Sequence, residues 1–274
     1  MSVIESFISP KDEELSQRFL SQGYLIQPVD NRPALDALRH GVVEIIANHI
    51  GVPLPANEAD FLNFIHNQVP IAQLNQMRLA VFSKMNALPW FKPTYYGLAR
   101  SALEIVVGNE LVMQNKVNLS VQYPEDHSSL LSVHADTWSD ESPFQVVVWL
   151  PLENVYDTKS MYILEPEHNR TVRTTLKDIA KDGGSDKLFE AYKDKFKWLD
   201  VPYGNALIFS PNLLHGNVVN RTPETRWSMN CRFKGLFSPY LSDEKRLGTF
   251  YTPITVKPAS RVGINYKIPE GFNE

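Results

Sequence analysis

Two histidines and one aspartate are the residues best suited to chemistry in this sequence. His134 and Asp136 belong to the stretch SVHAD at 132–136, and His215 belongs to LLHG at 213–216. In extended backbone, side chains two residues apart point the same way, so His134 and Asp136 can face one ion. Two imidazoles and one carboxylate bind Fe(II) and leave positions open for other ligands and oxygen, and such a set also suits catalytic zinc. An H-x-D pair by itself is weak evidence, because two such side chains can simply hydrogen-bond in a loop.

An arginine and a serine follow the second histidine closely. Arg226 stands eleven residues after His215 (226 − 215), and Ser228 stands two residues further on. A guanidinium pairs with a carboxylate through two parallel hydrogen bonds, and a nearby hydroxyl adds a third. An arginine buried without an anion is costly. The pattern therefore predicts a pocket for a dicarboxylate whose far end is anchored at Arg226 while its near end reaches the metal.

The segment that carries this arginine, RWSMNCRF at 226–233, alternates strictly between polar and apolar residues. Period-two alternation predicts a β-strand with two unlike faces. The polar face can be directed either to water or into a pocket, and the expected carboxylate site favours the pocket. Asn230 and Arg232 continue that face and are candidates for substrate contact.

A second alternating segment, KVNLSVQY at 116–123, precedes the H-x-D motif and presents Asn118, Ser120 and Gln122 on one side. We expect Asn118 and Gln122 to lie at the cofactor or the substrate. A solvated strand face is the alternative.

Helical patterns dominate the first 110 residues. Ser9 and Pro10 form a helix start, and Gly23 a helix end, around the first of these patterns. A short strand-like run, GYLIQPV, follows at 23–29. Helices are predicted at 10–22, 34–50, 60–68, 71–88 and 94–107.

Short strands dominate from residue 111, separated by turn signals that contain Pro, Gly or Asn. A charged insert at 171–192 is expected to be helical, and the proline-spaced tail is expected to be extended. Helices followed by many short strands are typical of an antiparallel sandwich or barrel with helices packed outside. Strands are predicted at 116–123, 144–152, 160–166, 197–203, 205–211, 213–220 and 226–233.

Composition excludes several classes of protein. The net charge of −4 gives no basic surface for nucleic acid and no polybasic membrane signal. The single cysteine, Cys231, excludes an internal disulfide framework and lies on the apolar face of its segment, so we expect it to be buried. The N-terminal residues lack a cationic, apolar leader, and no stretch is long enough to span a membrane. We therefore expect a soluble, cytoplasmic protein, and the sequence predicts no oligomeric state.

Over nearly its whole length, the chain resembles the phytanoyl-CoA-hydroxylase-like branch of Fe(II)/2-oxoglutarate-dependent oxygenases. The resemblance is carried by FLSQGYLIQPV at 19–29, SVHAD at 132–136 and LLHGNVVNRTPETRWS at 213–228. It implies an α+β protein with a mainly β core, a double-stranded β-helix (a cupin-like jelly roll) with N-terminal helices packed outside. We expect one domain, with helical support over about 1–110, the jelly roll over 111–240 and an extended tail over 241–274.

The same resemblance implies roles for individual residues. His134, Asp136 and His215 would be the iron ligands, and Arg226 with Ser228 would hold the C5 carboxylate of 2-oxoglutarate. Ascorbate would serve as a reductant for the iron, and O2 and a small molecule would be the other substrates.

Two segments depart from the usual pattern of that branch. Pro166, Glu167 and His168 replace its Pro-Gly-Ser-His, which predicts that His168 is a structural turn residue. KSMYIL at 159–164 lacks the usual glycine and cysteine, and it resembles the subgroup found in carbohydrate biosynthesis clusters. Lys159 is either a solvated residue or a second carboxylate anchor.

The expected reaction is hydroxylation, desaturation or ring closure of a polar small molecule such as a sugar, a nucleotide-sugar or an aminocyclitol. A carboxylate at Asp136 occupies the position that a halide would need, which argues against halogenation. The alternatives are a cupin-like sugar epimerase or isomerase, a non-catalytic small-molecule-binding barrel and a zinc hydrolase. The Arg226 and Ser228 pattern favours the oxygenase over all three.

Overall fold

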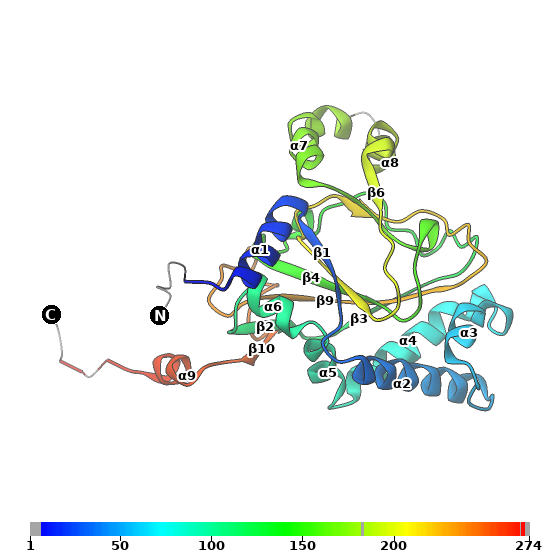
Figure 1. Ribbon diagram of the computed structural model, residues 1–274, viewed down its shortest axis with the longest axis horizontal. Coiled ribbons are helices and arrows are strands. Elements are labelled where there is room, and N and C mark those ends of the chain that lie inside the picture. Colours follow the sequence, from blue (N-terminus) through cyan, green and yellow to red (C-terminus); the bar gives the residue numbers. More distant parts are fainter. Residues whose placement is uncertain (1–6, 182–183, 269, 272–274) are drawn as a thin grey trace.

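A computed structural model describes residues 7–181, 184–268 and 270–271 of the chain (Figure 1). The first third is mainly helical. Ser9 caps the first helix by accepting a hydrogen bond from the Asp12 amide at 3.1 Å, and Gly23 ends it in a left-handed conformation with φ of 75°. The helices here are α1 (Pro10–Gln22), α2 (Arg32–Ile50), α3 (Glu58–Asn63), α4 (Ile71–Ala87), α5 (Phe91–Gly97) and α6 (Arg100–Val106).

The predicted helix at 94–107 is divided into α5 and α6, separated at Leu98 and Ala99. Asp30 accepts hydrogen bonds from the Ser101 amide at 2.8 Å and the Ser101 hydroxyl at 2.5 Å, at the start of α6. The contact joins residues 71 positions apart, so periodicity within the segment could not reveal the break.

The main sheet is antiparallel, in the order β1-β7-β4-β9-β2-β10, with β3 also paired to β9. The long strand β9 pairs with β4 along one side, and with β3 and then β2 along the other. The strands are β1 (Tyr24–Pro28), β2 (Leu111–Gln114), β3 (Asn118–Gln122), β4 (Gln145–Pro151), β7 (Asn205–Phe209), β9 (Arg226–Gly235) and β10 (Tyr251–Thr255).

A small second sheet has the order β6-β5-β8, with β5 (Tyr162–Leu164), β6 (Phe196–Trp198) and β8 (His215–Gly216). A buried apolar cluster that includes Val147, Leu207 and Ile163 joins it to the main sheet. Another cluster packs the far face of the main sheet against the N-terminal helices, with Val148 and Ile208 from the sheet and Leu38 from α2. Two antiparallel sheets with helices outside confirm the predicted fold class.

The charged insert is helical in its described part, which forms α7 (Pro166–Lys181) and α8 (Gly184–Tyr192) over the small sheet (Figure 1). Leu188 of α8 packs in one cluster with Tyr162 and Phe196. His168 lies inside α7 rather than in the expected turn, because the helix begins at Pro166. Short 3-10 helices occur at Ile65–Asn67, Asp136–Ser139, Asp157–Lys159 and Lys193–Lys195.

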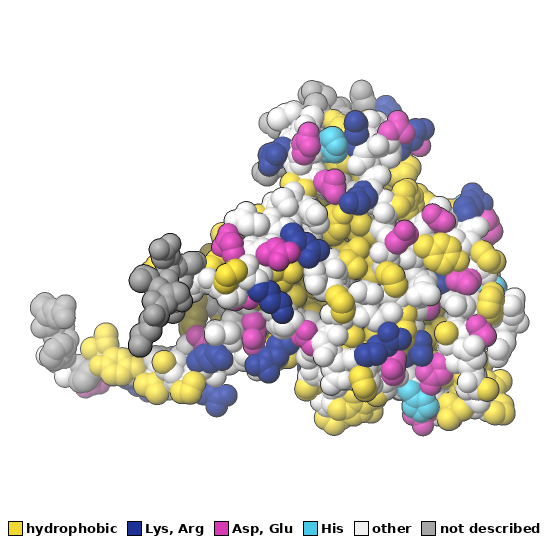
Figure 2. All heavy atoms as spheres, in the orientation of Figure 1, with side chains coloured by type: hydrophobic (Ala, Val, Ile, Leu, Met, Phe, Trp, Pro, Cys, Tyr) yellow, Lys and Arg dark blue, Asp and Glu magenta, His cyan; other side chains and the backbone are white. Residues whose placement is uncertain are grey.

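The expected extended tail contains a strand and a helix in its described part. β10 pairs with β2, and α9 (Pro258–Asn265) begins with Pro258, which fits the first turn of a helix as well as it fits extended chain. Glu110 holds the start of α9 by accepting hydrogen bonds from the Lys257 amide at 2.8 Å and the Ser260 hydroxyl at 2.9 Å. Beyond this contact the segment projects from the body with apolar side chains exposed (Figures 1 and 2): Val262, Ile264, Tyr266 and Ile268.

Within the residues that the structure describes, no helix combines the length and the apolar character needed to cross a membrane.

Candidate metal centre

The small sheet brings the H-x-D segment beside the second histidine. The backbones of His134 and His215 form a reciprocal bridge, with N–O distances of 3.0 and 2.9 Å, and their ring centroids lie 4.4 Å apart. Asp136 begins a 3-10 helix immediately afterwards, which directs its carboxylate toward the two rings. The three side chains that the spacing singled out therefore converge, although Asp136 lies outside the strand pairing that joins His134 and His215.

The donor atoms of this trio lie within 4.8 Å of one another. Oδ1 of Asp136 is 3.7 Å from Nε2 of His134 and 3.8 Å from Nε2 of His215. Each Nδ1 faces a backbone carbonyl, that of Ser132 at 2.7 Å or of Leu213 at 2.9 Å. A carbonyl can only accept, so each Nδ1 carries the hydrogen and each Nε2 keeps a lone pair for a metal.

Electrostatics also favour a metal at this position. Burial lowers the pKa of His215 to about 4, against the raising effect of Asp136, so its imidazole is neutral near pH 7. Neutral imidazole is the form that binds metals. The donor set fits Fe(II), and it opens onto a pocket of about 270 Å³ that leaves room for further ligands.

Arg232, one of the two candidates for substrate contact, instead pairs with the carboxylate of the trio. Its Nη2 lies 2.9 Å from Oδ2 of Asp136. The other carboxylate oxygen, Oδ1, is the one that faces the imidazoles. Its Nε lies 3.5 Å from Oε1 of Glu141, and its Nη1 donates to Oε1 of Gln114 at 3.2 Å. Glu141 is 3% exposed and also pairs with Lys245 at 2.9 Å. Asp136 is thus held through its outer oxygen by a buried network that reaches the C-terminal tail.

Arg226 lines the same pocket as the metal trio and is 3% exposed. Its Nη1 donates to the Ser160 carbonyl and its Nη2 to the Ser120 hydroxyl, both at 3.3 Å, while its buried Nε has no partner. Among the described residues, no carboxylate lies within ion-pair distance of this guanidinium. Burial lowers the pKa of Arg226 to about 10, so the side chain stays cationic near pH 7. A buried, unpaired cation that faces a pocket is a site for an anionic ligand.

The polar face of β9 is directed into this pocket, as the sequence predicted. Asn230 lines it and accepts a hydrogen bond at 3.1 Å from Asn118, its cross-strand partner on β3, which also lines it. Ser228 stands between Arg226 and Asn230, opposite Ser120, and its buried hydroxyl has no hydrogen-bond partner in the described part of the chain. The structure thus places Asn118 in the pocket and Ser228 beside Arg226 on its inward face.

Gln122 is not brought into the pocket. It is fully buried, and its amide donates to the Val218 carbonyl at 2.7 Å, so it holds the chain after β8 against β3. The alternation of β3 identified the inward face correctly, but it did not show where along the strand the pocket ends.

Lys159 is neither solvated nor a lining residue of the metal pocket. Its side chain is fully buried, and its Nζ donates to Oδ1 of Asn63 at 2.7 Å and pairs with Oε2 of Glu224 at 2.8 Å. Nearby Glu153 accepts a hydrogen bond from the Trp227 amide at 2.6 Å, and burial raises its pKa to about 8. Glu153 thus contacts the backbone of β9 at the residue that follows Arg226.

Sequence reasoning missed several lining residues. Ser120 lies on the same polar face of the alternating segment as Asn118, so the alternation could have identified it. Trp149, Met161, Phe209 and Asn217 also line the pocket, and the first three come from runs that are apolar throughout. Which side chain of such a run faces a cavity depends on tertiary packing.

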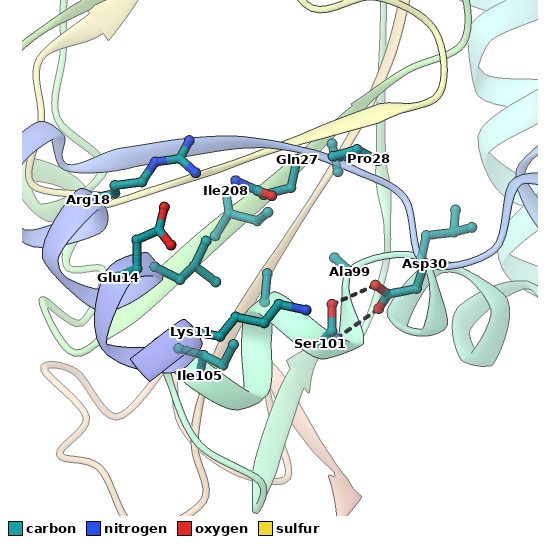
Figure 3. A pocket seen from close by; sticks show the side chains of 14 residues that line it. Lys11, Glu14, Arg18, Gln27, Pro28, Asp30, Ala99, Ser101, Ile105 and Ile208 are labelled. Atoms are coloured by element: carbon teal, nitrogen blue, oxygen red, sulfur yellow. Dashed lines mark hydrogen bonds between the residues drawn. The ribbon is translucent and has the colours of Figure 1, made fainter. Parts of the chain in front are cut away.

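A separate pocket of about 310 Å³ lies on the helical side of the main sheet, between α1, β1 and α6 (Figure 3). Lys11, Glu14 and Arg18 of α1 line it with exposed side chains of both charges, and Lys11 extends toward Ser101. Ile208 belongs to the core on this side of the sheet, whereas Phe209, its neighbour in β7, faces the metal pocket. The two pockets therefore lie on opposite faces of the sheet.

No protein-family model matches this chain, and no curated protein matches it. Solved structures do resemble it. The nickel complex of the non-heme monooxygenase ThoJ has a TM-score of 0.56 at 14% identity, over 90% of this chain and 85% of that chain. EctD from S. alaskensis, solved with 2-oxoglutarate and 5-hydroxyectoine, has a TM-score of 0.56 at 15% identity, over 95% and 89%.

HygX from Streptomyces hygroscopicus, solved with nickel and 2-oxoglutarate bound, has a TM-score of 0.52 at 13% identity, over 85% of this chain and 89% of that chain. At such identities the likeness is one of fold. The chain therefore has the jelly-roll fold of the non-heme Fe(II)/2-oxoglutarate oxygenases.

Proposed function

We propose that this protein is an Fe(II)- and 2-oxoglutarate-dependent oxygenase that hydroxylates, desaturates or cyclises a polar small molecule. One observation carries the proposal. A trio of imidazole and carboxylate donors lines the same pocket as Arg226, a buried guanidinium without an ion-pair partner among the described residues. The pocket therefore has the groups to bind a metal ion and an anion at the same time.

The residues divide into two ends of one site. His134, Asp136 and His215 would hold Fe(II) at one end, with their Nδ1 hydrogens and the outer Asp136 oxygen fixed by the protein. Arg226 would bind the C5 carboxylate of 2-oxoglutarate at the other end, through the N–H groups that its two weak protein contacts leave available. Ser228 and Ser120 stand beside it with hydroxyls that can add a hydrogen bond.

When both are bound, Fe(II) and 2-oxoglutarate supply the oxidation: 2-oxoglutarate and O2 yield succinate, carbon dioxide and an oxygen atom for a substrate C–H bond. The contribution of the chain is to orient the reactants and exclude water. Trp149, Met161 and Phe209 form an apolar wall of the pocket, while Asn118 and Asn230 offer amides that can orient a hydroxylated substrate.

The fold supports this reading over the rival functions. EctD and HygX share the fold and were solved with 2-oxoglutarate bound. A cupin-like epimerase or a simple binding barrel has no need of a buried arginine that binds a carboxylate. A zinc hydrolase would need a general base, and the described residues that line the pocket include no carboxylate other than Asp136.

The decisive experiment is a succinate assay by mass spectrometry with purified protein, Fe(II), ascorbate, 2-oxoglutarate and O2. We expect slow succinate formation even without the main substrate, and faster formation with a mixture of candidate sugars and sugar nucleotides. Succinate should disappear when Fe(II), 2-oxoglutarate or O2 is omitted, and in His215→Ala. The absence of any 2-oxoglutarate binding by calorimetry with Ni(II)-loaded protein would overturn the proposal.

A further inference from the structure

A second chamber of about 390 Å³ adjoins the metal pocket. It lies between α4, β3 and the loop after β3, and α4 contacts β3 directly. Ser120 and Leu131 line both cavities. The two cavities therefore adjoin at these two residues. Together they are called the cleft, which reaches from the metal trio to the N-terminal half of α4.

Arg78 is the only charged side chain among the described residues that line this chamber. Its Nη2 donates to Oδ1 of Asn75 at 2.8 Å, and its Nη1 donates to the Leu119 carbonyl at 3.4 Å, so the half-buried guanidinium is held in place. In the described part of the molecule no carboxylate lies within 4 Å of it. Six other arginines do pair with carboxylates in that part: Arg32, Arg39, Arg100, Arg221, Arg232 and Arg246.

The part of the chamber wall formed by the loop after β3 presents hydroxyl oxygens. Ser128 and Ser129 donate their hydroxyl hydrogens to Asp126, at 2.7 and 2.6 Å. Asp126 also accepts the Ser128 amide at 2.7 Å and is 4% exposed, so its charge is compensated by three hydrogen bonds and is covered. Because their hydrogens are used, the two serine oxygens are acceptors for hydroxyl groups of a ligand.

The charges of the whole cleft select among possible substrates. Its lining holds Arg78, Arg226 and Arg232, whereas Asp136 is the single acidic side chain that the described residues contribute. Asp136 already pairs with Arg232. A protonated amine bound here would find no carboxylate to compensate its desolvation, whereas an anion would find the unpaired guanidinium of Arg78.

We propose that Arg78 binds an anionic group, a phosphate or a carboxylate, at the far end of a hydroxylated substrate whose other end reaches the metal. The proposal rests on the oxygenase function proposed above and narrows its substrate class. It favours acidic sugars, sugar phosphates and sugar nucleotides, and it disfavours cationic aminocyclitols. The three N–H groups of Arg78 that make no protein hydrogen bond can bind the oxygens of such a group.

Calorimetry on protein loaded with Ni(II) and 2-oxoglutarate tests this with five probes: glucose, glucosamine, glucuronate, glucose 1-phosphate and uridine diphosphate glucose. We expect at least one anionic probe to bind more tightly than glucose, and more weakly as salt is added. Arg78→Gln should weaken that probe about tenfold to a hundredfold, which is the range for losing a charge-assisted hydrogen bond. Glucuronate and glucose 1-phosphate separate a carboxylate site from a phosphate site.

Two further variants complete the test. Arg78→Lys should keep only part of the affinity, because lysine keeps the positive charge but lacks the planar guanidinium that forms two parallel hydrogen bonds. Lys84→Gln removes an exposed cation from the same helix, outside the chamber, and should leave every affinity unchanged. Thermal unfolding of each variant should match the wild type.

The outcomes separate this inference from the proposed function. If glucosamine or glucose binds as tightly as the best anionic probe, or if Arg78→Gln changes nothing, the assignment of Arg78 is wrong while 2-oxoglutarate still binds. If the wild type does not bind 2-oxoglutarate at all, the oxygenase proposal fails. Lys84→Gln should bind 2-oxoglutarate, and form succinate without the main substrate, as the wild type does.

Discussion

Nη2 of Arg232 lies 2.9 Å from Oδ2 of Asp136, while Oδ1 of the same carboxylate lies 3.7 and 3.8 Å from the two imidazole Nε2 atoms. The arginine thus occupies one oxygen and leaves the other for a metal. This arrangement favours binding through a single oxygen and fixes the direction of that oxygen. Because Arg232 is held in turn by Glu141, the orientation of a metal ligand depends on a buried charge network behind it.

We predict that Arg232→Gln lowers the affinity for Fe(II), or for Ni(II) as its substitute, by about tenfold to a hundredfold, the usual effect of losing an outer partner of a metal ligand. Competition with a chelator of known affinity measures the change. Arg232→Lys should have a smaller effect. Arg221→Gln is the matched control, because it breaks an exposed pair with Glu125 that stands outside the metal pocket. Equal metal affinity in Arg232→Gln and wild type would contradict the role.

Replacing a member of the metal trio should remove metal binding without unfolding the protein. His134→Ala and Asp136→Ala should each lower metal affinity by more than about a hundredfold, beyond the effect of an outer partner. Iron-dependent succinate formation should be lost with it. Metal content after dialysis and thermal unfolding are the measurements, and His168→Ala in α7 serves as the control. Full metal occupancy in either trio variant would show that the ligands lie elsewhere.

The 2-oxoglutarate requirement should depend on Arg226. Removing one partner of a buried, hydrogen-bonded charge pair typically costs about 2–5 kcal/mol, so Arg226→Ala should weaken 2-oxoglutarate binding by roughly thirtyfold to a few thousandfold. Arg226→Lys should recover only part of this, because an ammonium does not reproduce the planar fork. Calorimetry with Ni(II)-loaded protein reports the affinity directly. An unchanged value in both variants would move the carboxylate site away from Arg226.

Glu153 should make stability depend on pH. Its pKa is raised to about 8 in the fold because burial opposes the charged form, whereas in the unfolded chain a glutamate titrates near about 4.3. Between these values the folded state holds a proton that the unfolded state has lost. The contribution of Glu153 to stability is therefore full at low pH and decreases as pH rises toward about 8.

Glu153→Gln keeps an acceptor for the Trp227 amide and does not titrate. The difference in unfolding free energy between variant and wild type should therefore shift in favour of the variant as pH rises from about 4.3 to about 8. Urea unfolding of the metal-free proteins at several pH values measures it, and taking the difference cancels the titration of the histidines. A constant difference over this range would show that Glu153 is ionised in the folded protein.

Much of the site could be predicted from the sequence, because local spacing carried it. The interval between His134 and Asp136 and the alternation of 226–233 are properties of extended backbone, in which side-chain direction follows residue number. The residue types then indicated the chemistry proposed for the site, since imidazole and carboxylate bind metals and a guanidinium binds carboxylates. The same local rules gave the cap at Ser9 and the helix end at Gly23.

Tertiary structure decided which of the polar residues enter the pocket. Arg226 and Lys159 are both buried cations, but Lys159 finds Glu224 and Asn63, whereas Arg226 finds no carboxylate among the described residues. Gln122 and Asn118 share one face of β3, but only Asn118 reaches the cavity. Arg232 pairs with Asp136 only because β9 passes beside the segment that carries the aspartate. Partners such as these are separated by tens of residues, so packing rather than local sequence determines whether a charge is neutralised or left for a ligand.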